Sequence, residues 1–269
     1  MSKRSYKMMR TLIVLLAFLP LASFGWGNGQ SGNASTNLPE ECISPPYSTH
    51  DWIADNALEL LPASEKAWLS PHKTMYLLGT EAPDNRHIPI ECNTPHSGYD
   101  DRGKGHSVEW SADWTMINDR PAVRAEEEYQ KAVAAYRNNN FSAAAFYLGA
   151  MAHYIGDVTQ YGHSVPFENN HSNYESWVGR RTKNFTSDVF SQYIVADNLI
   201  RRTPYTAVKR ISKVTAGGNS RILWASRMDE LYVEKKDNQA YLDSIGHSLN
   251  FGVNELADVL HRFYLNEVE

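Results

Sequence analysis

Five side chains of the types that commonly bind metal ions lie within one short stretch of this 269-residue chain. His153 and Asp157 are four residues apart, His171 and Glu175 repeat that spacing, and His163 lies between the two pairs. Residues four apart share one face of an α-helix, so each pair would present an imidazole beside a carboxylate. These are the ligands that zinc takes where cysteine is lacking. One such pair alone would suggest an ordinary polar helix face, but five residues in this arrangement indicate a metal site.

The pattern of apolar residues predicts the helices that position these ligands. Asn140 is a potential N-cap for a largely buried helix from Phe141 to about Gln160, and Gly162 would then let the helix end. A long irregular region is expected at 83–104, and no long alternating strand pattern is present. We therefore predict an all-α fold in one multi-helix domain. The other expected helices are 50–61 (capped by Thr49), 63–69, 119–138, 173–202, 205–214, 220–234 and 239–266.

The amino terminus has the three parts of a secretory signal. Residues 1–25 carry four cationic side chains near the start, an apolar run over 11–21 and small residues over 22–25. The apolar run is short for a membrane span, so an uncleaved anchor is the weaker alternative. We expect cleavage after Gly25 and a domain spanning 26–269, secreted or periplasmic.

Charge and cysteine content narrow the function classes. The formal net charge is −5, and it becomes −9 once residues 1–25 are removed. An acidic protein binds nucleic acid poorly, although bound zinc could make a site locally positive, so no stable nucleic-acid partner is expected. Cys42 and Cys92 are compatible with one disulfide in an oxidising compartment or with two free thiols. Two isolated cysteines are too few for a zinc–thiolate site.

The segment His153–His163, followed by His171–Glu175, resembles the bacterial zinc-dependent phospholipase C family. The resemblance includes Thr49–Ile53 and Gly79–Asn85 and covers roughly residues 26–180. It implies a secreted all-α enzyme with a trinuclear zinc cleft.

The resemblance also implies which residues hold the three zinc ions, one of them an amino terminus that only processing would create. Asp84 would additionally act as the general base. His96 competes with His106, which we prefer because it precedes a segment that can be ordered. The three sets are Asp84, His106, His153 and Asp157; the amino group and carbonyl of Trp26 with His50 and the shared Asp157; and His163, His171 and Glu175.

The expected reaction is hydrolysis of the phosphodiester of a glycerophospholipid, giving diacylglycerol and a phosphorylated headgroup, with transient contact to a membrane surface. Clustered zinc ions would offset the negative charge that develops during attack by water. Two alternatives are a zinc-dependent single-strand nuclease or 3′-nucleotidase, and a non-catalytic secreted zinc-binding protein. Asn85 stands where well-characterised relatives have an aromatic residue beside choline, which leaves the headgroup open. The sequence does not indicate an oligomeric state.

Overall fold

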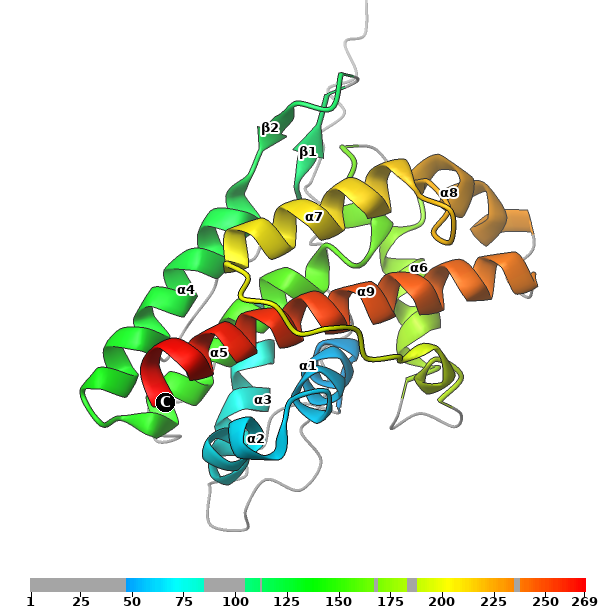
Figure 1. Ribbon diagram of the computed structural model, residues 1–269. Helices are drawn as coiled ribbons and strands as arrows, with labels where there is room; N and C mark the ends of the chain where they lie inside the picture. The colour runs from blue at the N-terminus through cyan, green and yellow to red at the C-terminus, as the bar shows by residue number, and fades with distance from the viewer. Residues whose placement is uncertain (1–46, 85–104, 112, 167–168, 183–187, 235–237) are drawn as a thin grey trace, which may run out of the picture.

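The computed structural model describes residues 47–84, 105–111, 113–166, 169–182, 188–234 and 238–269, and over these ranges the chain is predominantly helical (Figure 1). The all-α prediction is confirmed. No described helix is both long and apolar enough to cross a membrane. The elements are α1 (Thr49–Glu59), α2 (Ala63–Leu69), the 3₁₀ turn η2 (Ser70–His72), α3 (Lys73–Glu81), β1 (Glu109–Trp110), β2 (Met116–Asn118), α4 (Arg120–Arg137), α5 (Phe141–Asp157), the 3₁₀ turn η4 (Tyr161–His163), α6 (His171–Gly179), the 3₁₀ turn η5 (Ser191–Tyr193), α7 (Pro204–Gly217), α8 (Ala225–Glu234), α9 (Gln239–Phe263) and the π-helical end η6 (Tyr264–Val268).

Helix α5 lies in the middle of the bundle, between α3 and α4, and the long helix α9 crosses the molecule (Figure 1). From Ala143 onward nearly all of α5 is buried, as its apolar composition predicts. α3 and α5 touch through their backbones: a Cβ atom on Gly149 would lie only 1.9 Å from the carbonyl oxygen of Tyr76. This close approach, which only glycine permits, brings the end of α3 against the last turns of α5.

The observed ends of helices α1 and α5 differ from those predicted from the sequence. α1 starts at Thr49 and is capped by Ser48, which forms a capping box with Asp51. α5 ends at Asp157, not near Gln160, and Gly162 lies in η4 instead of ending the helix. α3 is not among the helices that the sequence predicts.

The helix predicted over 173–202 is confirmed only up to Gly179, and its continuation over 188–202 is wrong. α6 ends at Gly179, and residues 194–203 run without regular structure along α9 (Figure 1). Three of their backbone N–H groups donate to side chains four residues apart on α9. Val195 donates to Asn250, Asp197 to Asn254 and Ile200 to Asp258, at 2.9, 3.0 and 2.9 Å. These bonds replace the intrahelical bonds that the pattern of apolar residues predicted.

A short antiparallel hairpin, formed by β1 and β2, precedes α4 in the chain. β1 pairs with β2, and their turn places Trp114 at a φ of 65°. Trp110 of β1 packs on α7, where its indole nitrogen donates to Ser212 at 3.3 Å. The hairpin therefore extends from the bundle as an ordered element beside α7.

Candidate metal centre

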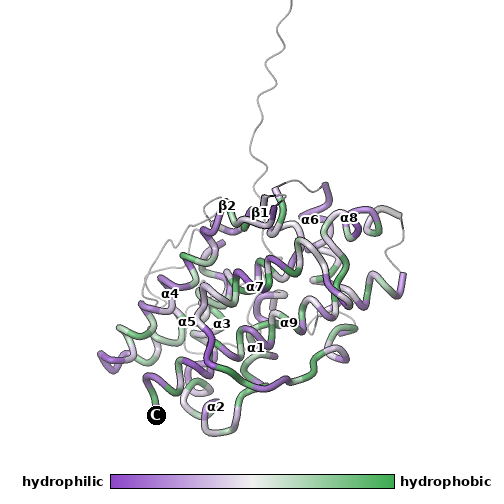
Figure 2. Tube along the Cα trace, turned by 45° about the horizontal axis from the view of Figure 1, so that its top comes forward, coloured by the Kyte–Doolittle hydropathy of each residue, from purple (hydrophilic) through white to green (hydrophobic). Residues whose placement is uncertain are grey.

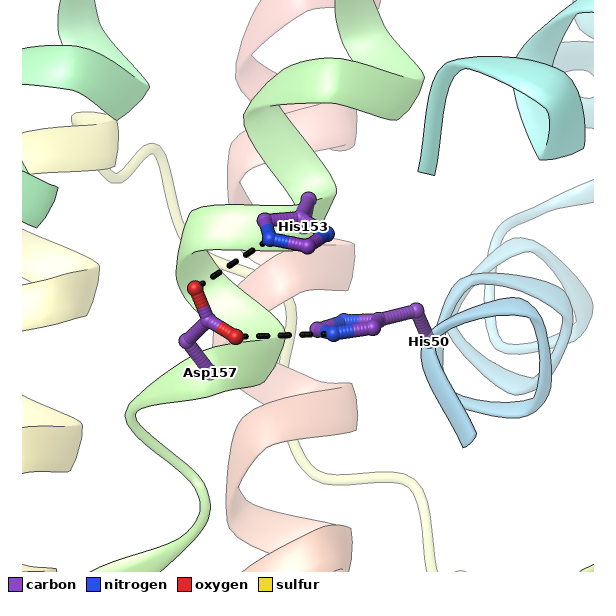
Figure 3. Close-up of side chains that lie close together, drawn as sticks. All are labelled: His50, His153 and Asp157. Carbon is purple, nitrogen blue, oxygen red and sulfur yellow. Dashed lines mark ion pairs between the residues drawn. The ribbon is translucent and has the colours of Figure 1, made fainter. Parts of the chain in front are cut away.

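One group of potential ligands joins α1 to the last turn of α5 (Figure 3). His50 Nε2 lies 3.4 Å from Asp157 Oδ1, and His153 Nε2 lies 3.3 Å from Asp157 Oδ2. The rings of His50 and His153 stack, with centroids 4.1 Å apart. The helical pair predicted from spacing thus gains a third member from a helix about 100 residues earlier.

A second group adds Asp84, just after α3, and His106, just before the hairpin. Asp84 Oδ1 lies 3.7 Å from His106 Nε2 and 4.0 Å from His153 Nε2. His106 Nδ1 lies 2.8 Å from Asp157 Oδ2 and 3.2 Å from His153 Nε2. His153 therefore belongs to both groups.

The third group consists of His163, His171 and Glu175, from η4 and the first turns of α6. Glu175 Oε1 lies 3.2 Å from His163 Nε2 and 2.9 Å from His171 Nε2. His163 Nε2 is also 3.7 Å from Asp157 Oδ1. Asp157 is therefore within 4 Å of ligands from all three groups.

Two glycines of the conspicuous sequence segment make this convergence sterically possible. A Cβ atom on Gly156 would lie 2.7 Å from Nδ1 of His50, and one on Gly162 would lie 2.9 Å from Nδ1 of His171. The sequence analysis did not assign either role. Only their position next to ligands could have suggested it.

Hydrogen bonds from outside the three groups orient the ligands. The Thr80 carbonyl accepts from His153 Nδ1 at 2.7 Å, which directs Nε2 toward the carboxylates. Thr80 is itself held by its hydroxyl, which donates to the buried carboxylate of Asp51. Gln160 donates to Glu175 at 3.2 Å. These positioning residues were also missed, because they act through other side chains and carry no ligand pattern.

The buried charges are arranged as metal ligands require. Burial lowers the pKa of His50, and His153 nearby lowers it further, so His50 is neutral. Burial alone would raise the pKa of Asp157, but His153, His163 and His106 bring it far below the usual range. Glu175 behaves likewise through His163 and His171. Ionised carboxylates beside a neutral His50 are protonation states that bind metal.

Buried polar atoms without hydrogen-bond partners in the ligand groups also fit a bound zinc ion. Among the described residues, the ring nitrogens of His50, Asp157 Oδ1 and Glu175 Oε2 are buried without a hydrogen-bond partner. Such atoms are rare in native proteins and call for an ion or water. Tetrahedral zinc with bonds near 2.1 Å separates its ligands by about 3.4 Å, close to the spacings in all three groups.

Five residues named above from the sequence lie outside the described residues: Trp26, Cys42, Asn85, Cys92 and His96. The Trp26 ligand, the proposed disulfide and the residue-by-residue zinc assignments therefore stay predictions. The structure places the other eight predicted ligands, including His106, in the three groups described above.

A helical domain whose buried imidazoles and carboxylates lie in adjoining groups belongs to the class of helical metalloproteins. The family model for zinc dependent phospholipase C matches residues 49–247. The chain therefore belongs to the zinc-dependent phospholipase C family, whose members are phosphoric diester hydrolases.

Two relatives, both phospholipases C of Bacillus cereus, are similar over most of the chain. One is 22% identical over 203 residues, covering 71% of this chain and 69% of the relative. The other is 27% identical over 195 residues, covering 70% and 66%.

The fold is also similar to two solved toxin structures. An alpha toxin from Clostridium absonum has a TM-score of 0.51 at 17% identity, with 82% of this chain and 64% of the toxin covered. The alpha-toxin of an avian strain of Clostridium perfringens has a TM-score of 0.50 at 15% identity, with 81% and 64% covered. This chain thus spans about two thirds of the toxins' length, and the likeness concerns the fold.

Proposed function

We propose that this protein hydrolyses the phosphodiester of glycerophospholipids and releases diacylglycerol and a phosphorylated headgroup. The observation that carries the proposal is the convergence of three buried ligand groups on Asp157 in a member of this family. The named relatives are phospholipases C, which supports the same reaction here.

The proposed centre holds three zinc ions. When bound, zinc supplies concentrated positive charge that stabilises the developing charge on a phosphoryl group. His50, Asp157 and the predicted amino terminus at Trp26 would hold one ion. The other two sets are Asp84, His106, His153 and Asp157, and His163, His171 and Glu175.

Asp84 is proposed as the group that accepts a proton from the attacking water. Burial raises the pKa of its carboxyl, which makes the ionised form a stronger base than an exposed aspartate. In hydrolysis, the water oxygen bonds to phosphorus and the phosphorus–oxygen bond to diacylglycerol breaks. The diacylglycerol oxygen then takes up a proton.

A cavity of about 440 Å³ supports an anionic, partly apolar substrate. Its described lining comprises Gly105, Arg120, Val123 and Arg124. Gly105 precedes His106, so the cavity adjoins one of the ligand groups. Arg120 beside Val123 suits a phosphate with an attached hydrocarbon part, whereas Arg124 is already paired with Glu127 and Glu128.

Hydrolysis of phosphatidylcholine, phosphatidylethanolamine and single-stranded DNA, measured side by side on zinc-loaded protein, tests the proposal. We expect release of diacylglycerol from at least one lipid and no cleavage of DNA. A chelator should abolish lipid hydrolysis and added zinc should restore it, with about three ions bound by elemental analysis. DNA cleavage without lipid cleavage would favour the nuclease, whereas zero or one bound zinc with no hydrolysis would favour a non-catalytic protein.

Export and processing form part of the proposal, because Trp26 offers a free amino group only after cleavage. Sequencing the amino terminus of the protein recovered outside the cytoplasm should give Trp-Gly-Asn. A start at Met1 would remove both the signal peptide and the Trp26 ligand from the proposal.

A further inference from the structure

We propose that one face of the molecule docks onto bilayers that carry anionic phospholipid. The docking face consists of three exposed apolar side chains, Trp114, Ile117 and Trp224, with two lysines of α7, Lys209 and Lys213. Its purpose rests on the proposed function, because docking would present lipid to the metal centre. Its existence is tested separately from hydrolysis.

Large apolar side chains protrude at this face. Trp114, Ile117 and Trp224 are 45%, 63% and 51% exposed. Tryptophan prefers the interface between membrane and water, where its ring is buried and its N–H stays hydrated. Adjacent exposed aromatic residues on a protein are typical of an interaction surface.

The hairpin lies beside α7 (Figures 1 and 2), and its turn contacts Gly217, the last residue of that helix. The ring of Trp114 lies over Gly217, where a Cβ atom would come within 2.3 Å of it. A Cβ atom on the next residue, Gly218, would lie 2.9 Å from the backbone nitrogen of Trp224. The two tryptophans therefore flank one pair of glycines.

The turn that carries Trp114 is held by its own hydrogen bonds. The Ser111 N–H donates to the carbonyl of Thr115 at 2.9 Å. The carboxylate of Asp113 accepts from the Ser111 hydroxyl and from the Thr115 N–H, so its charge is directed into the turn. The side chain of Trp114 is 45% exposed and its ring contacts Gly217.

The α7 part of the docking face is positively charged, although the chain as a whole is negatively charged. The net charge of the chain is −5, yet α7 has three basic residues and no acidic one. Lys209 and Lys213 are exposed and four residues apart, and the Lys213 ammonium lies 5.8 Å from the ring centroid of Trp110. Arg210 differs, because it pairs with Glu255 of α9. Lys213 beside Trp110, with Lys209 one helical turn before it, matches a surface of anionic headgroups.

The docking face connects directly to the segment that carries His163. The Val108 N–H, at the base of the hairpin, donates to the His163 carbonyl at 2.8 Å. From α7, the hydroxyl of Thr215 lies 2.6 Å from that of Ser164. At about 3.3 Å per residue, Trp114 lies no more than about 20 Å from Val108 along the chain. A bilayer at the docking face would therefore lie close to the metal centre.

Co-sedimentation of zinc-loaded protein with vesicles tests this inference. One set of vesicles is pure phosphatidylcholine and the other adds phosphatidylglycerol. The apolar variant combines Trp114→Asn, Ile117→Thr and Trp224→Gln, with asparagine chosen because it tolerates a positive φ. We expect its partitioning onto anionic vesicles to fall about tenfold or more.

A second variant, Lys209→Gln with Lys213→Gln, keeps every apolar side chain. We expect it to lose about fivefold in partitioning per lysine on anionic vesicles, with no change on neutral ones. Because it changes only exposed lysines, this variant still tests the docking face if the apolar variant fails to fold. The matched control is Val195→Thr with Ile200→Thr, which removes equally exposed side chains beside α9 and should bind as wild type.

Hydrolysis of a short-chain phosphatidylcholine below its micelle concentration separates docking from the proposed reaction. Docking variants that lose vesicle binding and keep this hydrolysis support the inference. Wild-type protein that ignores anionic vesicles, or docking variants that bind as well as wild type, would overturn it. Vesicle binding as expected without hydrolysis of any lipid would instead refute the proposed function and leave docking in place.

Discussion

Asp157→Asn is expected to release about one zinc ion or more per molecule and to lower phosphodiester hydrolysis on the order of 10³-fold, equivalent to about 4 kcal/mol. The amide keeps the shape of the side chain and removes its charge. Asp157 is buried, and its oxygens lie 2.8 to 3.7 Å from nitrogens of four imidazoles. These imidazoles come from all three ligand groups. Elemental analysis and initial rates on phosphatidylcholine measure the effect.

Asp258→Asn is the matched control, since it also turns a buried aspartate into an amide. Asp258 accepts from the Ile200 N–H and pairs with Arg202, away from the ligand groups. The control should lose stability and keep its zinc. If Asp157→Asn retained full zinc and wild-type rates, the centre would not depend on Asp157 as we propose.

Asp84→Asn is expected to lower turnover by about 10² to 10⁴-fold while most of the zinc stays bound. Asparagine does not accept a proton from water, yet its oxygen still faces His106 and His153. Zinc content, KM and kcat together separate this result from loss of the centre. The change should lie in kcat.

Glu81→Gln is the control for Asp84→Asn. Glu81 is also buried and lies three residues earlier, where its carboxylate accepts from the Ser48 hydroxyl. We expect less than about a tenfold change in rate, because Glu81 belongs to none of the ligand groups. Near-normal turnover in Asp84→Asn would refute its role as base, and loss of most zinc would make it mainly a ligand.

Local spacing predicted what depends on a single helix. The pairs His153–Asp157 and His171–Glu175 follow from the period of an α-helix, and α5 and α6 present them as expected. The positions of His50 and Asp84 beside α5 depend on how α1 and α3 pack. The sequence alone carried no such information, and these residues were found through the resemblance to a family.

The failed prediction of a helix over 188–202 has a physical reason outside that segment. Its apolar residues, such as Ile194 and Leu199, do pack against the core. The backbone bonds come from Asn250, Asn254 and Asp258, more than 50 residues later. The pattern of apolar residues in a segment indicates which side chains are buried. It does not indicate which groups accept hydrogen bonds from the backbone of that segment.

The convergence of distant segments on Asp157 also bears on how the chain folds. An ion shared by His50 and Asp157 would join, in the native state, two segments that are roughly 100 residues apart in the chain. Because the unfolded chain does not hold these ligands together, the free energy of binding zinc would add to the free energy of folding. A chelator would then remove part of the stability of the bundle as well as its chemistry. The supply of zinc would set how much of the chain is folded at all.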